Sequence, residues 1–122
     1  MIFNHPDDIF YAPIDIIVHS CNCFNTFGAG IAKEIKKRFP EAYKIDCQTK
    51  KGDKSKLGTY SFAKIDYKNS IPVEKNYIKF IVNLYSQYKY GPIGTRYTSY
   101  DAFYDGLEKL RDRIFSLKKE ET

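Results

Sequence analysis

The sequence lacks any apolar run long enough to cross a membrane. Its longest uncharged stretch, residues 16–32, contains histidine, serine, threonine and two asparagines, which makes it too polar for a lipid environment. The N-terminus has neither the basic nor the apolar region of a secretory signal. We therefore expect a cytoplasmic protein that has no membrane partner.

Cysteine is scarce as well. The chain has three cysteines, Cys21, Cys23 and Cys47, whereas a disulfide framework needs an even number at a higher density. A zinc site that used His19 with Cys21 and Cys23 would need a fourth ligand such as Cys47, and Cys-x-Cys is not the usual Cys-x-x-Cys spacing. We expect reduced thiols, no metal and no cofactor.

The residues that are present predict one folded domain. The chain has 122 residues, 43% of them hydrophobic, and its eleven Tyr and nine Phe can bury a large surface, which excludes intrinsic disorder. The net charge of +5 comes entirely from residues 33–56, which hold nine Lys or Arg and four Asp or Glu. This basic segment indicates either an anionic ligand or a solvated, Lys-rich helix face.

The hydrophobic pattern predicts an α/β fold. Strands are expected at residues 14–19, 57–65 and 77–85, and the first and third of these have the continuous apolar pattern of strands that are buried on both faces. Helices are expected from residue 31 to 39, from 41 towards 48, and from a cap at Thr98 or Ser99. The last helix has an apolar stripe at positions 103, 107, 110, 114 and 117. Ligands of such sheets bind at the carboxyl ends of the strands, so residues 19–30 and 85–97 are the loops of interest.

The junction between the first strand and its helix is rich in small residues. Gly28 and Gly30 allow the backbone to approach a ligand closely, and free amides at a helix start attract phosphate. The junction is not a dinucleotide fingerprint, because Lys33 stands at the third glycine position, and the chain has no P-loop. A plain tight turn is the alternative. His19, at the end of the strand, could be catalytic or a hydrogen-bonded structural residue, and nothing marks a third residue that would orient it beside a cysteine nucleophile.

These residues resemble the macrodomain family, and in particular its branch of ADP-ribose-1''-phosphate phosphatases and ADP-ribosyl hydrolases. The resemblance begins with the motifs His19-Ser20-Cys21-Asn22-Cys23, Gly28-Ala29-Gly30-Ile31-Ala32 and Arg38-Phe39-Pro40. It extends outwards to Asp8-Ile9-Phe10, Asn83-Leu84-Tyr85-Ser86-Gln87 and Arg96-Tyr97-Thr98-Ser99-Tyr100-Asp101-Ala102.

The resemblance implies a single domain over residues 1–122 with a three-layer α/β/α fold and a mixed sheet. Relative to the family, the sequence lacks a C-terminal strand, a second glycine-rich loop and a helix. The resemblance also implies a ligand-binding role for the following residues: Asp8 and the backbone of Ile9 at the adenine, Asn22 at the distal ribose, the backbone of Gly28, Ala29, Gly30, Ile31 and Ala32 at the diphosphate, and Ser86 and Gln87 along the cleft. His19 and Asn22 are the expected catalytic residues, with His19 as a base or phosphate partner.

The leading functional prediction is hydrolysis of ADP-ribose 1''-phosphate to ADP-ribose and phosphate. One alternative is removal of ADP-ribose from a modified macromolecule by the same pocket. Another is a binding module without turnover, which the missing C-terminal loop favours. Nucleic-acid binding ranks last, because the basic segment has no aromatic residues interleaved on the same face.

Overall fold

The computed structural model describes residues 9–10, 13–28, 30–65, 78–89 and 99–121. In chain order the elements are β1 (Ile16–Cys21), α1 (Gly30–Arg38), α2 (Pro40–Cys47), a 3-10 helix (Lys54–Lys56), β2 (Tyr60–Lys64), β3 (Phe80–Tyr85) and α3 (Tyr100–Glu121).

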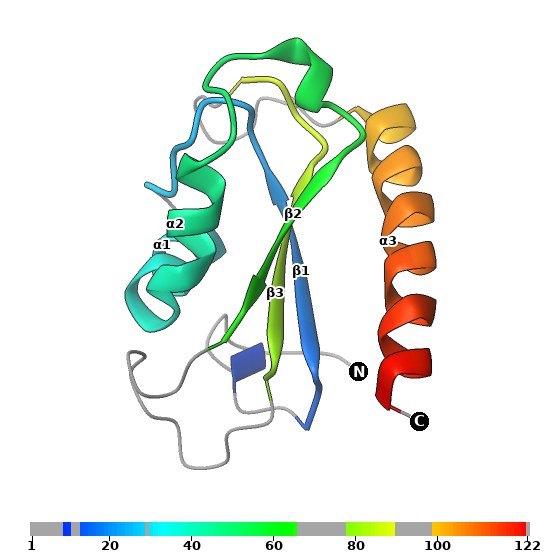
Figure 1. Cartoon of the computed structure of the whole chain (residues 1–122). Coiled ribbons are helices and arrows are strands. Elements are labelled where there is room, and N and C mark those ends of the chain that lie inside the picture. The colour runs from blue at the N-terminus through cyan, green and yellow to red at the C-terminus, as the bar shows by residue number, and fades with distance from the viewer. Residues whose placement is uncertain (1–8, 11–12, 29, 66–77, 90–98, 122) are drawn as a thin grey trace.

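The three described strands form one mixed sheet in the order β1-β3-β2. β1 runs parallel to β3, with Ile16 opposite Phe80, and β2 runs antiparallel to β3, with Tyr60 opposite Leu84. Helices α1 and α2 cover one face of the sheet and α3 covers the other (Figure 1). This arrangement confirms the predicted three-layer α/β/α fold with a mixed sheet.

The strands differ in how deeply they are buried. The central strand β3 is buried on both faces from Ile81 to Tyr85, as predicted. The same prediction for β1 is wrong, because its residues alternate: Ile17 is buried, whereas Val18 is 39% exposed. The reason is that α3 packs more closely against β3, so that Val18 lines an open apolar groove beside Leu110 and Ile114 of the helix.

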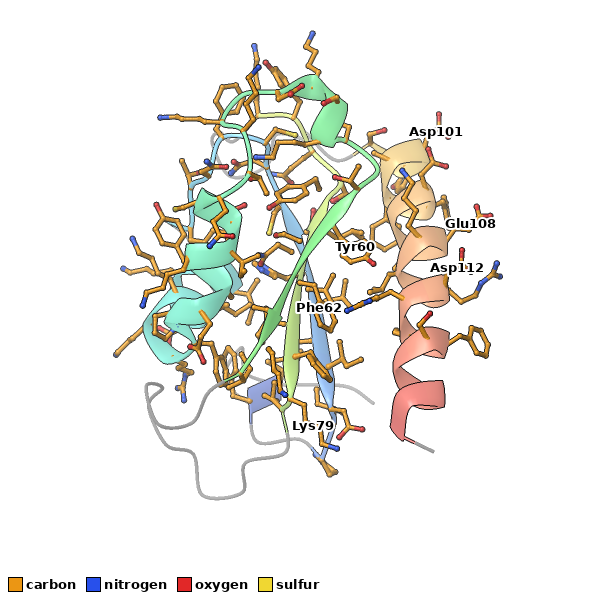
Figure 2. The ribbon with its side chains drawn as sticks, viewed as in Figure 1. Tyr60, Phe62, Lys79, Asp101, Glu108 and Asp112 are labelled. Carbon is orange, nitrogen blue, oxygen red and sulfur yellow. The ribbon has the colours of Figure 1, made fainter. Side chains whose placement is uncertain are left out.

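Helix α3 packs through smaller residues than predicted. The buried positions in its described part are Ala102, Gly106 and Leu110, one turn apart on the helix. A methyl group at Gly106 would collide with Leu84 of β3, so this glycine lets the helix approach the sheet closely. Tyr60 and Phe62 project from β2 towards this helix, while Asp101, Glu108 and Asp112 lie on the side of the helix away from the sheet (Figure 2).

The main core lies between the sheet and the α1–α2 layer. Its largest fully buried apolar side chains are Phe10, Ile17, Ile35, Phe39, Ile78 and Ile81. Pro40 separates the two helices as predicted, and it occupies the first turn of α2, where its missing N–H costs no hydrogen bond. Within the described part of the chain, no helix combines the length and the apolar character that a membrane span requires.

Candidate functional site

The parallel strands β1 and β3 end at the same edge of the sheet, and the segments that follow them lie side by side (Figure 1). The amide of Gln87 donates to the carbonyl of Cys21 at 3.4 Å, and the amide of Cys23 donates to the carbonyl of Tyr88 at 3.0 Å. The structure therefore brings together the beginnings of the two loops that the sequence predicts to carry the site, whereas residues 90–97 of the second loop lie outside the described residues.

The segment of residues 22–28, which we call the ligand loop, begins with a turn that Asn22 stabilises. Its side-chain oxygen accepts from the amide of Phe24 at 2.8 Å, and its amide group donates to Thr26 Oγ1 at 2.7 Å. Only 8% of Asn22 is exposed. Its side chain thus shapes the loop, and its predicted contact with a distal ribose stays a prediction.

Asn25 turns the ligand loop through a strained conformation, with φ of 58°. Four side-chain contacts hold it there. Tyr43 donates to its carbonyl at 3.2 Å, its own amide group donates to the carbonyl of Thr49 at 3.1 Å, and its side-chain oxygen accepts from Thr49 Oγ1 and Lys56 Nζ. Such strain persists only where the surroundings hold the residue firmly.

The glycines at the end of the ligand loop leave its backbone uncovered. A Cβ atom built on Gly28 or Gly30 would meet none of the heavy atoms that the structure describes elsewhere in the chain within 4 Å. Gly30 also has φ of +58°, a conformation that glycine adopts without strain. Helix α1 begins here with no acidic residue in its first turn, so its amides favour an anion. Ile31 and Ala32, in that first turn, are partly exposed, and Ala29 lies outside the described residues.

His19 points into the core. Its Nε2 atom lies 2.6 Å from Asn83 Oδ1, and its ring packs edge-on against Phe27 with centroids 5.2 Å apart. Asn83 donates its amide protons to Ala42 O and to Ser61 Oγ, so its oxygen must accept and the proton of His19 lies on Nε2. Burial lowers the pKa of His19, which leaves the imidazole neutral.

The hydrogen bonds of His19 continue through the core to a buried carboxylate. Beyond Asn83, Ser61 Oγ lies 2.8 Å from the hydroxyl of Tyr85, which donates to Asp46 Oδ1 at 2.6 Å. Asp46 is fully buried, and its burial raises the pKa of the carboxyl above its ordinary value. Every donor in this series points towards Asp46, an order that strengthens each bond.

Sequence reasoning missed Asp46 and Tyr85 as members of a polar network. The available signal was the position of Asp46 on α2, four residues after the buried Ala42 and seven after the buried Phe39. This spacing places the carboxylate on the apolar face of the helix.

The segment after β3 contributes Ser86 and Gln87. Ser86 is fully buried, its hydroxyl pairs with that of Ser20, and its carbonyl accepts from the amide of Ser99 at 2.6 Å. Gln87 is partly buried, and its side chain donates to the carbonyl of Lys89 at 3.2 Å. Their predicted contacts with a ligand remain predictions.

The structure describes one of the two predicted adenine-site residues. Asp8 lies outside the described residues. Ile9 is described, and its partly buried side chain packs against the main core. Its backbone remains the predicted neighbour of adenine.

The described cysteines are all free thiols. Burial raises the pKa of Cys21 well above its ordinary value, so this thiol is protonated near neutral pH and is a poor nucleophile. The described residues contain no group of three or more His, Cys, Asp or Glu side chains that could hold a metal ion.

The sequence is similar to two kinds of curated protein. It is 42% identical over 77 residues to an uncharacterised 17.5 kDa protein from the tk-vs intergenic region of Enterobacteria phage T4, a match that covers 62% of this chain and 45% of the relative. It is 47% identical over 47 residues to an ADP-ribose 1''-phosphate phosphatase of Debaryomyces hansenii, covering 36% of this chain and 26% of the relative. No protein-family model matches the sequence.

The structure is similar to the macrodomain of Mycobacterium tuberculosis DarG, with a TM-score of 0.66 and 19% sequence identity. The match covers 91% of this chain and 66% of that one. The chain has a macrodomain fold. It spans less than half the length of the two curated relatives and about two thirds of this macrodomain. The macrodomain resemblance noted from the sequence is thereby confirmed at the level of the fold.

Proposed function

We propose that this macrodomain-fold chain binds ADP-ribose or its 1''-phosphate at the ligand loop. The observation that carries the proposal is the backbone at Gly28 and Gly30, which none of the described residues covers and which leads into the first turn of α1. A diphosphate group has the charge and the acceptor oxygens that such a helix start favours. The Debaryomyces hansenii relative, which is named as an ADP-ribose 1''-phosphate phosphatase, supports the same ligand class.

Each part of the ligand is assigned to a different segment of the chain in this proposal. The backbone of residues 28–32 would hold the diphosphate, and the segment with Ser86 and Gln87 would form the other wall, because it hydrogen-bonds to the start of the ligand loop. Asn22 would face the distal ribose through any part of its amide that Thr26 leaves accessible. The adenine end is assigned to Asp8 and to the backbone of Ile9.

The enzymatic proposal is hydrolysis of ADP-ribose 1''-phosphate. Water attacks the phosphorus, the bond to the ribose oxygen breaks, and phosphate and ADP-ribose leave. His19 and Asn22 are the proposed catalytic residues. Proton transfer requires a base within hydrogen-bond reach of the attacking water, either directly or through a second water.

A second candidate function is binding without turnover. It is favoured by the position of His19, which is only 5% exposed and donates its ring proton to Asn83 in the core. In this case His19 supports the fold, and the ligand loop accounts for the binding.

Three assays on the whole chain separate these functions. Calorimetric titration measures binding of ADP-ribose, phosphate release from ADP-ribose 1''-phosphate measures the phosphatase, and ADP-ribose release from a modified protein measures the hydrolase. A saturable titration with neither product identifies a binding module. If ADP-ribose does not bind at all, the proposed function is wrong.

The site itself is tested with Gly28→Val. Gly28 has no positive φ and no neighbour within 4 Å of a Cβ atom, so valine adds bulk without a clash against the described residues. We expect an unchanged thermal midpoint and at least a tenfold weaker affinity for ADP-ribose. Ser116→Val, at an exposed position of α3, is the matched control. An unchanged affinity of Gly28→Val for ADP-ribose would show that the ligand does not bind at this loop.

A further inference from the structure

Lys56 is a buried cation beneath the ligand loop. It ends the 3-10 helix Lys54–Lys56, whose N-cap Asp53 accepts from the amide of Ser55. Only 7% of Lys56 is exposed, although lysine is among the residues that are almost never buried without a partner. Its neighbour Lys54, two residues earlier in the same helix, is exposed.

The ammonium group of Lys56 contacts the ligand loop twice. Nζ donates to the carbonyl of Cys23 at 3.1 Å and to Asn25 Oδ1 at 2.8 Å. The carbonyl of Cys23 also accepts from the amide of Gly52 at 2.6 Å. One side chain therefore ties the start of the loop to its strained turn at Asn25, and these bonds to a charged donor are stronger than neutral ones.

The charge of Lys56 is balanced from the core side. Its Nζ atom lies 4.7 Å from the centroid of the Tyr85 ring, and the hydroxyl of that ring donates to Asp46. A cation, an aromatic ring and a carboxylate thus follow one another from the ligand loop into the core. The cation–π contact and the nearby carboxylate reduce the cost of burying the ammonium group.

From these contacts we propose that Lys56 is a positioning residue for the ligand loop. By holding Cys23 and Asn25, Lys56 fixes the backbone that leads to Gly28 and to the start of α1. The first-turn amides of α1 are then held in one geometry for an anionic ligand. The ligand in this inference, ADP-ribose, rests on the proposed function. The positioning of the loop by Lys56 rests only on the contacts described above.

Lys56→Met tests the role, with Lys54→Met as the matched control. Both variants remove one positive charge from the same 3-10 helix, but only the first removes the two bonds to the ligand loop. We expect amide hydrogen exchange over residues 22–28 to be at least tenfold faster in Lys56→Met than in the wild type. The affinity for ADP-ribose is expected to fall at least tenfold in Lys56→Met and less than twofold in Lys54→Met.

A reciprocal variant keeps the test valid if Lys56→Met does not fold. Asn25→Gly tolerates the positive φ while it removes one acceptor of Lys56. With acetic anhydride as the probe, we expect Lys56 to react at least fivefold faster in Asn25→Gly than in the wild type, and Lys54 at an unchanged rate. Equal reactivity of Lys56 in both proteins would overturn the proposal.

The arms of the experiment separate two failures. If the wild-type chain does not bind ADP-ribose, the proposed function fails, and hydrogen exchange and acetylation still decide whether Lys56 holds the loop. If ADP-ribose binds equally well to Lys56→Met and the wild type, or if exchange over residues 22–28 is unchanged, the positioning role is wrong. Equal losses of affinity in the Lys56 and Lys54 variants would also contradict the positioning role, because they would show a general effect of the lost charge.

Discussion

Replacing His19 by alanine separates a catalytic role from a structural one. The change removes the donor to Asn83 Oδ1 and leaves that fully buried oxygen without its partner. An unsatisfied buried polar atom costs about 1–3 kcal/mol. Loss of the buried ring contact with Phe27 adds about 1 kcal/mol. We therefore expect the free energy of unfolding to fall by about 2–4 kcal/mol in total.

This loss is large for a domain of this size. At about 4 °C for each kcal/mol, the thermal midpoint should fall by about 8–16 °C. The assay is thermal unfolding followed by circular dichroism, with Val18→Ala as the control. Val18 is the preceding residue on the open face of β1 and is already 39% exposed, so its truncation should change the midpoint by only a few degrees.

The opposite result would refute the structural role. If His19→Ala keeps the wild-type midpoint and the affinity for ADP-ribose, while phosphate release falls by about 10²–10⁴-fold, the imidazole is the acid–base group. If stability and affinity fall together with no specific loss of rate, the hydrogen bond to Asn83 is its function.

Two further predictions concern the same buried network. The pKa of His19 is lowered in the folded chain, so the unfolded chain binds more protons and the free energy of unfolding should decrease as the pH falls below about 6.5, with a slope of at most about 1.4 kcal/mol per pH unit. Urea titrations at pH 7.5 and 5.5 check this, and His19→Gln should abolish that part of the pH dependence. Tyr85→Phe removes the donor to Asp46 and should cost about 1.5–3 kcal/mol in the same assay. A loss no greater than that of Tyr104→Phe, at a tyrosine that is 66% exposed, would contradict the network.

The elements of the fold could be predicted because local chemistry determines them. The apolar segments at residues 16–21 and 80–85 are both strands, and Pro40 divides two helices. The junction between β1 and α1 was also predictable, because glycines such as Gly28 and Gly30 between a strand and a helix are typical of a tight turn or of a phosphate-binding backbone. Its role in binding a ligand stays a prediction. Periodicity alone could not reveal the open face of β1, because that depends on where the distant helix α3 packs.

Close packing at Gly106 was not predictable for a related reason. The apolar stripe of α3 directs attention to large residues, whereas the closest approach to the sheet occurs where the helix has no side chain. A glycine in a helix interior costs about 1 kcal/mol of helix propensity. The contact with Leu84 offsets this cost, and it is visible only once the helix and strand are placed together.

The basic segment shows most clearly why charge counting cannot find the site. Its excess of lysine predicted either a solvated face or an anionic ligand, and the lysines of α1 are indeed exposed to solvent. Lys56 belongs to the same segment but is buried, and so is Asp46, one of its four acidic residues. In the sequence, nothing distinguishes these two residues from the exposed charged residues around them. What distinguishes them is Tyr85, which lies almost thirty residues after Lys56 and almost forty after Asp46 in the sequence. Its ring lies next to the ammonium of Lys56, and its hydroxyl donates to the carboxylate of Asp46. The fold thus buries one cation and one anion of this charged segment around the same tyrosine, and under our proposal the cation holds the ligand loop.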